Sequence, residues 1–131
     1  MLLLLPAMGC FHELPLIGDL AGQWQITKIE YPDGRVVENP LTYYCFYRHT
    51  AQLTKYDRVK HTANMVYNYP EISLEFPEVS PVWLTEWGII PPADADSEYR
   101  GWVQNYHIDR LNSSYLVMTT EQGVKLTLRK F

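Results

Sequence analysis

A chain of 131 residues that is 47% hydrophobic and 20% charged is long enough for one folded domain with one core. The formal net charge is −4 and the sequence has no lysine and arginine cluster, which excludes the electrostatic pattern of a nucleic-acid-binding protein. The 10 tyrosines and 4 tryptophans outnumber the 4 phenylalanines, so much of the aromatic surface carries a polar atom. Such side chains suit the walls of a pocket or a half-hydrated surface.

The first nine residues form an apolar run that ends in small residues, and Cys10 follows directly. This segment resembles a bacterial lipoprotein signal, in which a peptidase cuts before a cysteine whose thiol takes up the lipid. An exposed apolar tail or a short buried strand is the alternative, and the run is too short to span a bilayer. We expect residues 1–9 to be the signal and Cys10 to anchor the protein in the bacterial cell envelope. The outer membrane is the expected site, with the periplasmic and surface faces both left open.

Lipidation of Cys10 would leave Cys45 unpaired within the aromatic stretch 43–47. A buried thiol that packs as a small apolar side chain is the favoured interpretation. A disulfide between the two cysteines is the alternative if Cys10 carries no lipid, because the envelope is an oxidising compartment.

Residues 10–21 are expected to be a tether with one helical turn at most, and short strands follow it. The first strand is predicted over 22–31, where Gly22 permits a tight bend into the sheet. Trp24 and Ile26 share one face of this strand, so Trp24 is the candidate anchor of the core.

The next segment has the residues of a hairpin. Pro32 and Gly34 predict a tight turn, which returns the chain as a strand over 35–38. β-branched and aromatic residues predict further strands over 43–53, 59–68 and 71–76. The last of these alternates strictly, and this puts three side chains on the core face: Ile72, Leu74 and Phe76.

The stretch 77–101 is the one long connection, because its prolines and its acidic run cannot form a long regular element. Ser80 as N-cap, Pro81 at the first helical position and Gly88 at the end predict one or two helical turns. Three apolar side chains of these turns are expected to face the sheet together: Trp83, Leu84 and Trp87.

A meander over 102–111, 115–120 and 124–131 completes the chain. Its alternation predicts one inward face: Trp102, Tyr106, Ile108, Leu116, Met118, Val124, Leu126 and Leu128. Eight short strands without a long helix predict an all-β, antiparallel up-and-down barrel, which leaves no open sheet edge. A two-sheet sandwich is the alternative. The interior of such a barrel is either filled by side chains or holds one small ligand.

Three segments carry a resemblance to a known family: Gly22-Gln23-Trp24, Trp87-Gly88, and the closing stretch 108–118 with 126–131. They resemble the lipocalin-like domain lipoproteins of Bacteroides-type bacteria, over nearly all of the mature chain. The resemblance implies a calycin-type barrel over 22–131 on a lipid anchor. It implies no catalytic residues, since the family has no assigned activity.

The sequence offers no convincing site for a metal, a cofactor or a catalytic reaction. The four histidines have no spacing that places two zinc ligands on one face: His12, His49, His61 and His107. The acidic residues 94–98 lack the glycine and the spaced glutamate of a calcium loop and suit a solvated loop instead. Ser97, Ser113 and Ser114 lack the context of a catalytic nucleophile. We therefore expect a non-enzymatic protein without a cofactor.

We expect the barrel to bind a small apolar or aromatic molecule, or a glycan, in its interior or at its mouth, with 77–101 as the lid. The candidate ligand-binding residues are Trp24, Tyr44, Phe46, Trp83, Trp87, Trp102 and Tyr106. The alternative is that Trp83 and Trp87 plug a filled barrel. The protein would then act as an envelope interaction or inhibitor module that presents the tyrosine-rich strand 43–47 to a protein partner.

Overall fold

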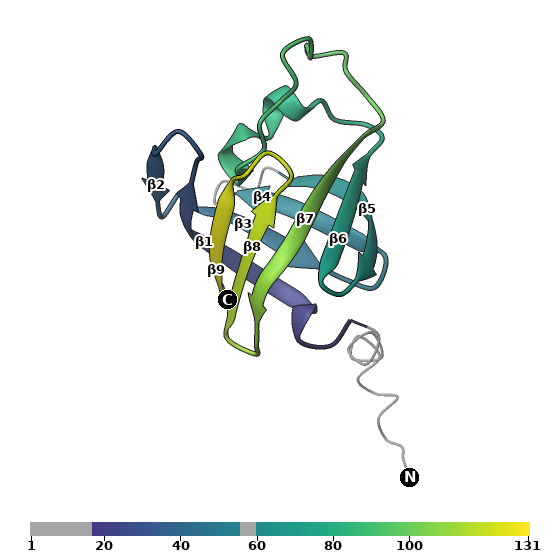
Figure 1. The fold of residues 1–131 in the computed structure, drawn as a ribbon. Helices are drawn as coiled ribbons and strands as arrows, with labels where there is room; N and C mark the ends of the chain where they lie inside the picture. The colour runs from purple at the N-terminus through teal and green to yellow at the C-terminus, as the bar shows by residue number, and fades with distance from the viewer. Residues whose placement is uncertain (1–16, 56–59) are drawn as a thin grey trace.

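Nine antiparallel strands stand out in the computed structural model, which describes residues 17–55 and 60–131 (Figure 1). They are β1 (Gly22–Glu30), β2 (Val36–Glu38), β3 (Thr42–Phe46), β4 (Thr50–Lys55), β5 (Lys60–Asn68), β6 (Glu71–Phe76), β7 (Trp102–Leu111), β8 (Tyr115–Thr120) and β9 (Lys125–Lys130). From β3 to β9 each strand pairs with the next, and β1 pairs with both β3 and β9. These eight strands close into an antiparallel barrel, which confirms the predicted fold class.

Strand β2 is a side branch of this barrel. The first half of one β1 edge pairs with β3, while the second half pairs with β2 through the turn at Pro32 and Gly34. The amide of Gly34 donates to the carbonyl of Tyr31 at 3.0 Å, as a tight turn requires. The predicted hairpin is therefore present, but its second strand lies outside the closed ring.

The predicted strand over 43–53 was wrong in one respect, because it is two strands, β3 and β4. The chain reverses at residues 47–49, where the amide of Tyr47 donates to the carbonyl of Thr50 at 2.8 Å. This turn contains no glycine or proline, so the aromatic and β-branched run has the composition of one continuous strand. The extra strand takes the place of β2 in the ring, which keeps the barrel at eight strands.

Two β-bulges adjust which residues point inward. The β1–β9 register shifts between Ile26 and Lys28, so the inward positions continue at Ile29 instead of Lys28. A second bulge in β7, between Ile108 and Arg110, ends the inward run of that strand. The inward faces predicted for β6, β8 and β9 are otherwise all buried.

The two ends of the barrel differ. The upper end is the end that carries the connections 31–35, 77–101 and 121–124 (Figure 1). The lower end is the end that carries the connections 47–49, 69–70 and 112–114. The 3₁₀ turn η2 (Gly18–Leu20) lies at the lower end. The described residues contain no helix long and apolar enough to cross a bilayer.

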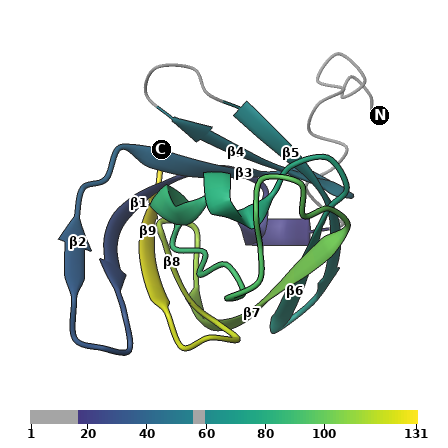
Figure 2. The same ribbon diagram turned by 90° about the horizontal axis from the view of Figure 1, so that it is seen from above.

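Two 3₁₀ turns lie across the upper end: η3 (Pro81–Trp83) and η4 (Thr85–Trp87). Figure 2 looks down on this end and shows both turns over the ring of strands. The hydroxyl of Ser80 accepts a hydrogen bond from the amide of Val82, and Gly88 ends η4 in the left-handed conformation. The predicted cap residues and the two helical turns are therefore confirmed.

Candidate functional site

Trp87 plugs the upper end of the barrel. Its side chain is fully buried, and its indole N–H lies 3.1 Å from two carbonyl oxygens, those of Tyr43 and Thr54. The Tyr44 hydroxyl donates to the Trp87 carbonyl at 2.9 Å and lies 2.8 Å from the Tyr106 hydroxyl. Burial raises the pKa of Tyr44 and of Tyr106, so both hydroxyls stay protonated as donors. This network fixes η4 to the barrel wall.

The lower end is closed by Trp24 in the same manner. Its fully buried indole donates to the carbonyl of Leu20 at 2.9 Å, and the ammonium group of Lys130 lies 4.5 Å from its ring. Phe46 is also fully buried and stacks on Tyr44 with ring centroids 5.7 Å apart. Five of the seven predicted ligand-binding side chains thus belong to the packed core: Trp24, Tyr44, Phe46, Trp87 and Tyr106.

The other two predicted ligand residues lie away from the core centre. Trp102 is half-buried, stacks on Phe76 with centroids 4.4 Å apart, and donates to the Val79 carbonyl at 2.8 Å. Trp83 is 60% exposed, so the prediction that it faces the sheet beside Leu84 was wrong. The two tryptophans of the connection diverge because η3 and η4 are separate 3₁₀ turns with a break at Leu84. A role for the seven side chains in ligand binding stays a prediction.

The strand 43–47 is no tyrosine-rich surface, which corrects the idea that it is presented to a partner. Tyr43 and Tyr44 are buried, and only Tyr47 is exposed. Cys45 points outward between the inward Tyr44 and Phe46 and is half-buried, so the prediction of a buried thiol was wrong. Its sulfur lies 3.1 Å from the Tyr47 hydroxyl. Cys10, the signal segment and the predicted disulfide lie outside the described residues.

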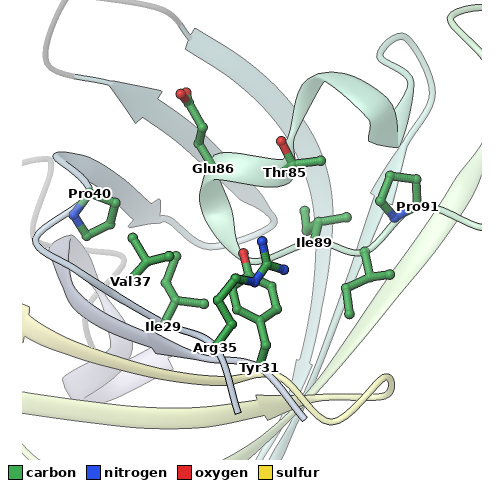
Figure 3. A pocket seen from close by; sticks show the side chains of 10 residues that line it. Ile29, Tyr31, Arg35, Val37, Pro40, Thr85, Glu86, Ile89 and Pro91 are labelled. Carbon is green, nitrogen blue, oxygen red and sulfur yellow. The ribbon is translucent and has the colours of Figure 1, made fainter. Parts of the chain in front are cut away.

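A groove of about 470 Å³ lies at the upper end, between the β1–β2 hairpin and the segment that contains η4 (Figure 3). We call it the mouth groove. Its lining is Ile29, Tyr31, Arg35, Val37, Pro40, Thr85, Glu86, Ile89, Ile90 and Pro91. A volume of this size falls in the range of small-molecule sites. Most of the wall is aliphatic, and exposed side chains at its edge, among them Arg35 and Thr85, leave it open to water.

The two charged side chains of the mouth groove differ in their state of pairing. Glu86 is held by Lys55, whose ammonium nitrogen is 2.7 Å from the carboxylate. Arg35 lies with its guanidinium carbon 3.9 Å from the centroid of the Tyr31 ring, and within the described residues it makes no ion pair. Among the described residues, the groove therefore offers an anion one cation that no carboxylate neutralises, beside apolar walls.

The segment 89–91 is positioned by the close packing of Gly88. A β-carbon at Gly88 would lie 2.6 Å from a methyl carbon of Leu126 in β9, and its φ of +84° also favours glycine. This contact brings the main chain directly onto the barrel wall, where Ile89 is buried. Ile90 and Pro91 continue along the groove.

The sequence predicted a ligand site inside the barrel or at its mouth, and none of the seven side chains predicted for it lines the mouth groove. The hairpin residues Arg35 and Val37 and the Ile89-Ile90-Pro91 run were each visible, but nothing in their spacing shows that they meet. The signal in the sequence is the apolar run directly after Gly88, in a connection that is polar further on. Within 17–55 and 60–131, no three histidine, cysteine or acidic side chains gather closely enough to hold a metal ion.

Comparisons with known proteins agree with this barrel. A crystal structure of a lipocalin-like protein from Bacteroides uniformis is 25% identical over 87% of this chain and all of its own, with a TM-score of 0.63. An uncharacterized protein from Bacteroides eggerthii, 17% identical over 86% of this chain and 99% of its own, also has a TM-score of 0.63 and shows the same fold. No curated protein matches the chain. The model of the lipocalin-like domain family matches residues 2–131, and the chain therefore belongs to this family.

Proposed function

We propose that this protein binds a small apolar anion, such as a carboxylate with a short alkyl or aryl body, in the mouth groove. The observation that carries this proposal is Arg35, which places a cation without a carboxylate partner among the described residues beside aliphatic walls. Burial of the apolar body against the walls would contribute about 0.8 kcal/mol of binding free energy per methylene group. The guanidinium group would pair with the anionic head.

A glycan fits the groove less well than an apolar anion does. Sugars bind by stacking on an open aromatic face and by several polar groups. The guanidinium group of Arg35 already covers one face of Tyr31, and the remaining walls are mainly aliphatic. The interior is also a poor site, because Trp87 and Tyr44 fill the space below η4.

Calorimetric titration with octanoate, 1-octanol and maltotriose tests the proposed ligand class. We expect octanoate to bind most tightly. Arg35→Gln should weaken octanoate binding about tenfold, since a hydrogen bond to a charged group contributes about 1.5–3 kcal/mol and 1.4 kcal/mol is tenfold. Octanol binding should change little in the same variant.

The control is Arg100→Gln, because Arg100 is also an exposed arginine at the upper end, but it lies in the connection 77–101 and donates to the carbonyls of Ser97 and Tyr99, away from the groove lining. It should bind octanoate like the unaltered protein. Equal octanoate affinity of the Arg35→Gln protein, or tighter binding of maltotriose than of octanoate, would contradict the proposal.

We also propose that the protein is lipid-anchored through Cys10 in the bacterial envelope, on the strength of the apolar run and the small residues before this cysteine. Labelling of growing cells with a fatty-acid analogue should mark the protein, and Cys10→Ala should abolish the mark. Label on the Cys10→Ala protein would show another site of attachment.

A second candidate function, a protein-interaction or inhibitor module, is supported by the filled interior. The binding surface of such a module would be the outer edge of β2, where a partner strand could pair, since β1 pairs with only one edge of β2. If none of the three probes binds in the titrations, this candidate replaces the first.

A further inference from the structure

We infer that the lower end of the barrel is a membrane-docking surface, which lays its rim of aromatic and cationic side chains on a bilayer with anionic headgroups. This surface is distinct from the mouth groove, which lies at the upper end. It would orient the groove away from the membrane. The inference needs no ligand in the groove and no lipid on Cys10.

Exposed aromatic side chains gather at the lower end. Among the described residues five aromatic side chains are exposed, and Trp83 is the one that lies at the upper end. The other four stand at or beside the lower turns and at the C-terminus: Tyr47, Tyr69, Tyr115 and Phe131. Tyrosine is enriched where a protein meets the headgroup region, because its ring is apolar and its hydroxyl stays hydrated.

Cations accompany these rings. The guanidinium group of Arg110 lies 5.7 Å from the centroid of the Tyr115 ring, and Arg129 is directly opposite Tyr115 in the β8–β9 pair. Both arginines are exposed. A cation close to a membrane surface gains about 1 kcal/mol from anionic lipids. One side of the lower end therefore combines an aromatic side chain suited to the headgroup region, Tyr115, with two cations.

The upper end is more acidic than the lower end, where three exposed carboxylates stand beside four cations: Asp19, Glu71 and Asp109 beside Arg48, Arg110, Arg129 and Lys130. The upper connections carry seven carboxylates against two arginines, Arg35 and Arg100; the carboxylates are those of Asp33, Glu78, Glu86, Asp94, Asp96, Glu98 and Glu121. The negative surface potential of an anionic bilayer would repel this end. The charge distribution therefore favours a single orientation, with the lower end on the membrane.

The start of the described chain lies at the same end. Ile17 and η2 are at the lower end, where the Lys130 ammonium group donates to the carbonyl of Ala21 at 2.6 Å. Cys10 is seven residues before Ile17, a separation that spans about 25 Å at most when fully extended. A lipid on Cys10 would therefore hold this rim close to the bilayer.

A bilayer matches this arrangement better than a protein partner does. The four rings stand on three different connections or strand ends and the C-terminus, so they surround the barrel end and do not form one contiguous patch. Protein interfaces concentrate their binding energy in a packed central cluster. A laterally uniform surface can contact all four rings at once.

Vesicle partitioning of full-length Cys10→Ser protein tests the inference without any contribution from a covalent lipid. The vesicles are phosphatidylcholine with about one third phosphatidylglycerol, or phosphatidylcholine alone. The double variant Tyr69→Ser/Tyr115→Ser should partition at least tenfold less into the anionic vesicles. The matched control is Trp83→Ser, because Trp83 and Tyr69 are both 60% exposed but lie at opposite ends. It should partition like the parent.

Arg110→Gln/Arg129→Gln gives a second variant with unchanged rings. Its partitioning into anionic vesicles should fall at least tenfold, while its partitioning into pure phosphatidylcholine vesicles should not change. Residues 1–9 are common to all proteins, so a difference between variants reports on the barrel alone. Equal partitioning of the lower-end variants and the parent would overturn the inference, and so would a loss confined to Trp83→Ser. Loss of a co-purifying protein from the lower-end variants with unchanged partitioning would also overturn it and assign this rim to a protein partner.

Discussion

Trp24 joins the first strand to the turn that precedes it. Its buried indole packs in the core, and its N–H satisfies the carbonyl of Leu20 in η2. Trp24→Ala removes the buried indole and leaves a cavity in the core, so it should lower the unfolding free energy by about 3–5 kcal/mol. Gln23→Ala, at an outward and half-buried position, should cost less than about 1 kcal/mol. Similar urea midpoints for both variants would contradict this assignment of faces.

Gly88 shows how one glycine sets the position of the mouth groove. Gly88→Ala places a methyl group against the buried Leu126 at a left-handed φ, so it should cost about 2–4 kcal/mol. Gly101→Ala is the control, because its φ is also positive but no atom lies within 4 Å of the added carbon. It should cost only about 1 kcal/mol. Thermal unfolding of both variants measures the difference, and an equal loss would rule out the packing explanation.

At the scale of elements, η4 and strand β5 meet through His61 and Trp87. The His61 ring lies edge-on to the Trp87 indole with centroids 5.7 Å apart. Partial burial lowers the pKa of His61 below its usual value near 6.5. The unfolded chain therefore binds this proton more readily than the folded one, and stability should fall as the pH drops below about 6.5.

The test of this pH dependence is the urea midpoint at pH 7.5 and at pH 5.5. His61→Gln should reduce the loss of stability between the two values, because the titrating group is gone. His49→Gln, at an exposed position in the β3–β4 turn, should leave the loss unchanged. A pH dependence that is the same in both variants would assign it to other groups.

Most elements could be predicted because alternation along a strand reports directly on burial. The inward residues of β6, β8 and β9 and the cap residues Ser80 and Gly88 follow from such local patterns. The turn at 47–49 could not be predicted, since it contains none of the residues that usually mark a turn and lies between two stretches that favour strands. The bulge beside Ile26 could not be predicted either, because it depends on the register with β9.

The candidate site was harder to predict than the fold, because its walls come from segments about 50 residues apart in the chain. Arg35 and Ile89 face the same groove only after the hairpin and η4 have both docked on the barrel (Figure 3). Trp83 and Trp87, four residues apart, were expected to act together, yet the break between the 3₁₀ turns sends them to opposite environments. Local patterns carry no information on either arrangement.

At the scale of the whole molecule, the two ends of the barrel differ in charge and in exposed aromatic side chains. The upper end carries the mouth groove and most of the loop carboxylates, while the lower end carries the start of the described chain and four exposed aromatic rings. This arrangement is what we expect if the lower end docks on a membrane and the upper end binds small molecules, as we propose.

The most direct test of the central claim is the position of a bound apolar anion, and the seven isoleucines of the chain provide the probes. Ile29, Ile89 and Ile90 line the mouth groove, whereas Ile72 and Ile108 face the barrel interior. In protein with ¹³C-labelled isoleucine δ-methyl groups, nuclear Overhauser contacts from octanoate should reach the three groove methyls and neither interior methyl. Contacts to Ile72 or Ile108 would place the ligand inside the barrel and contradict the claim.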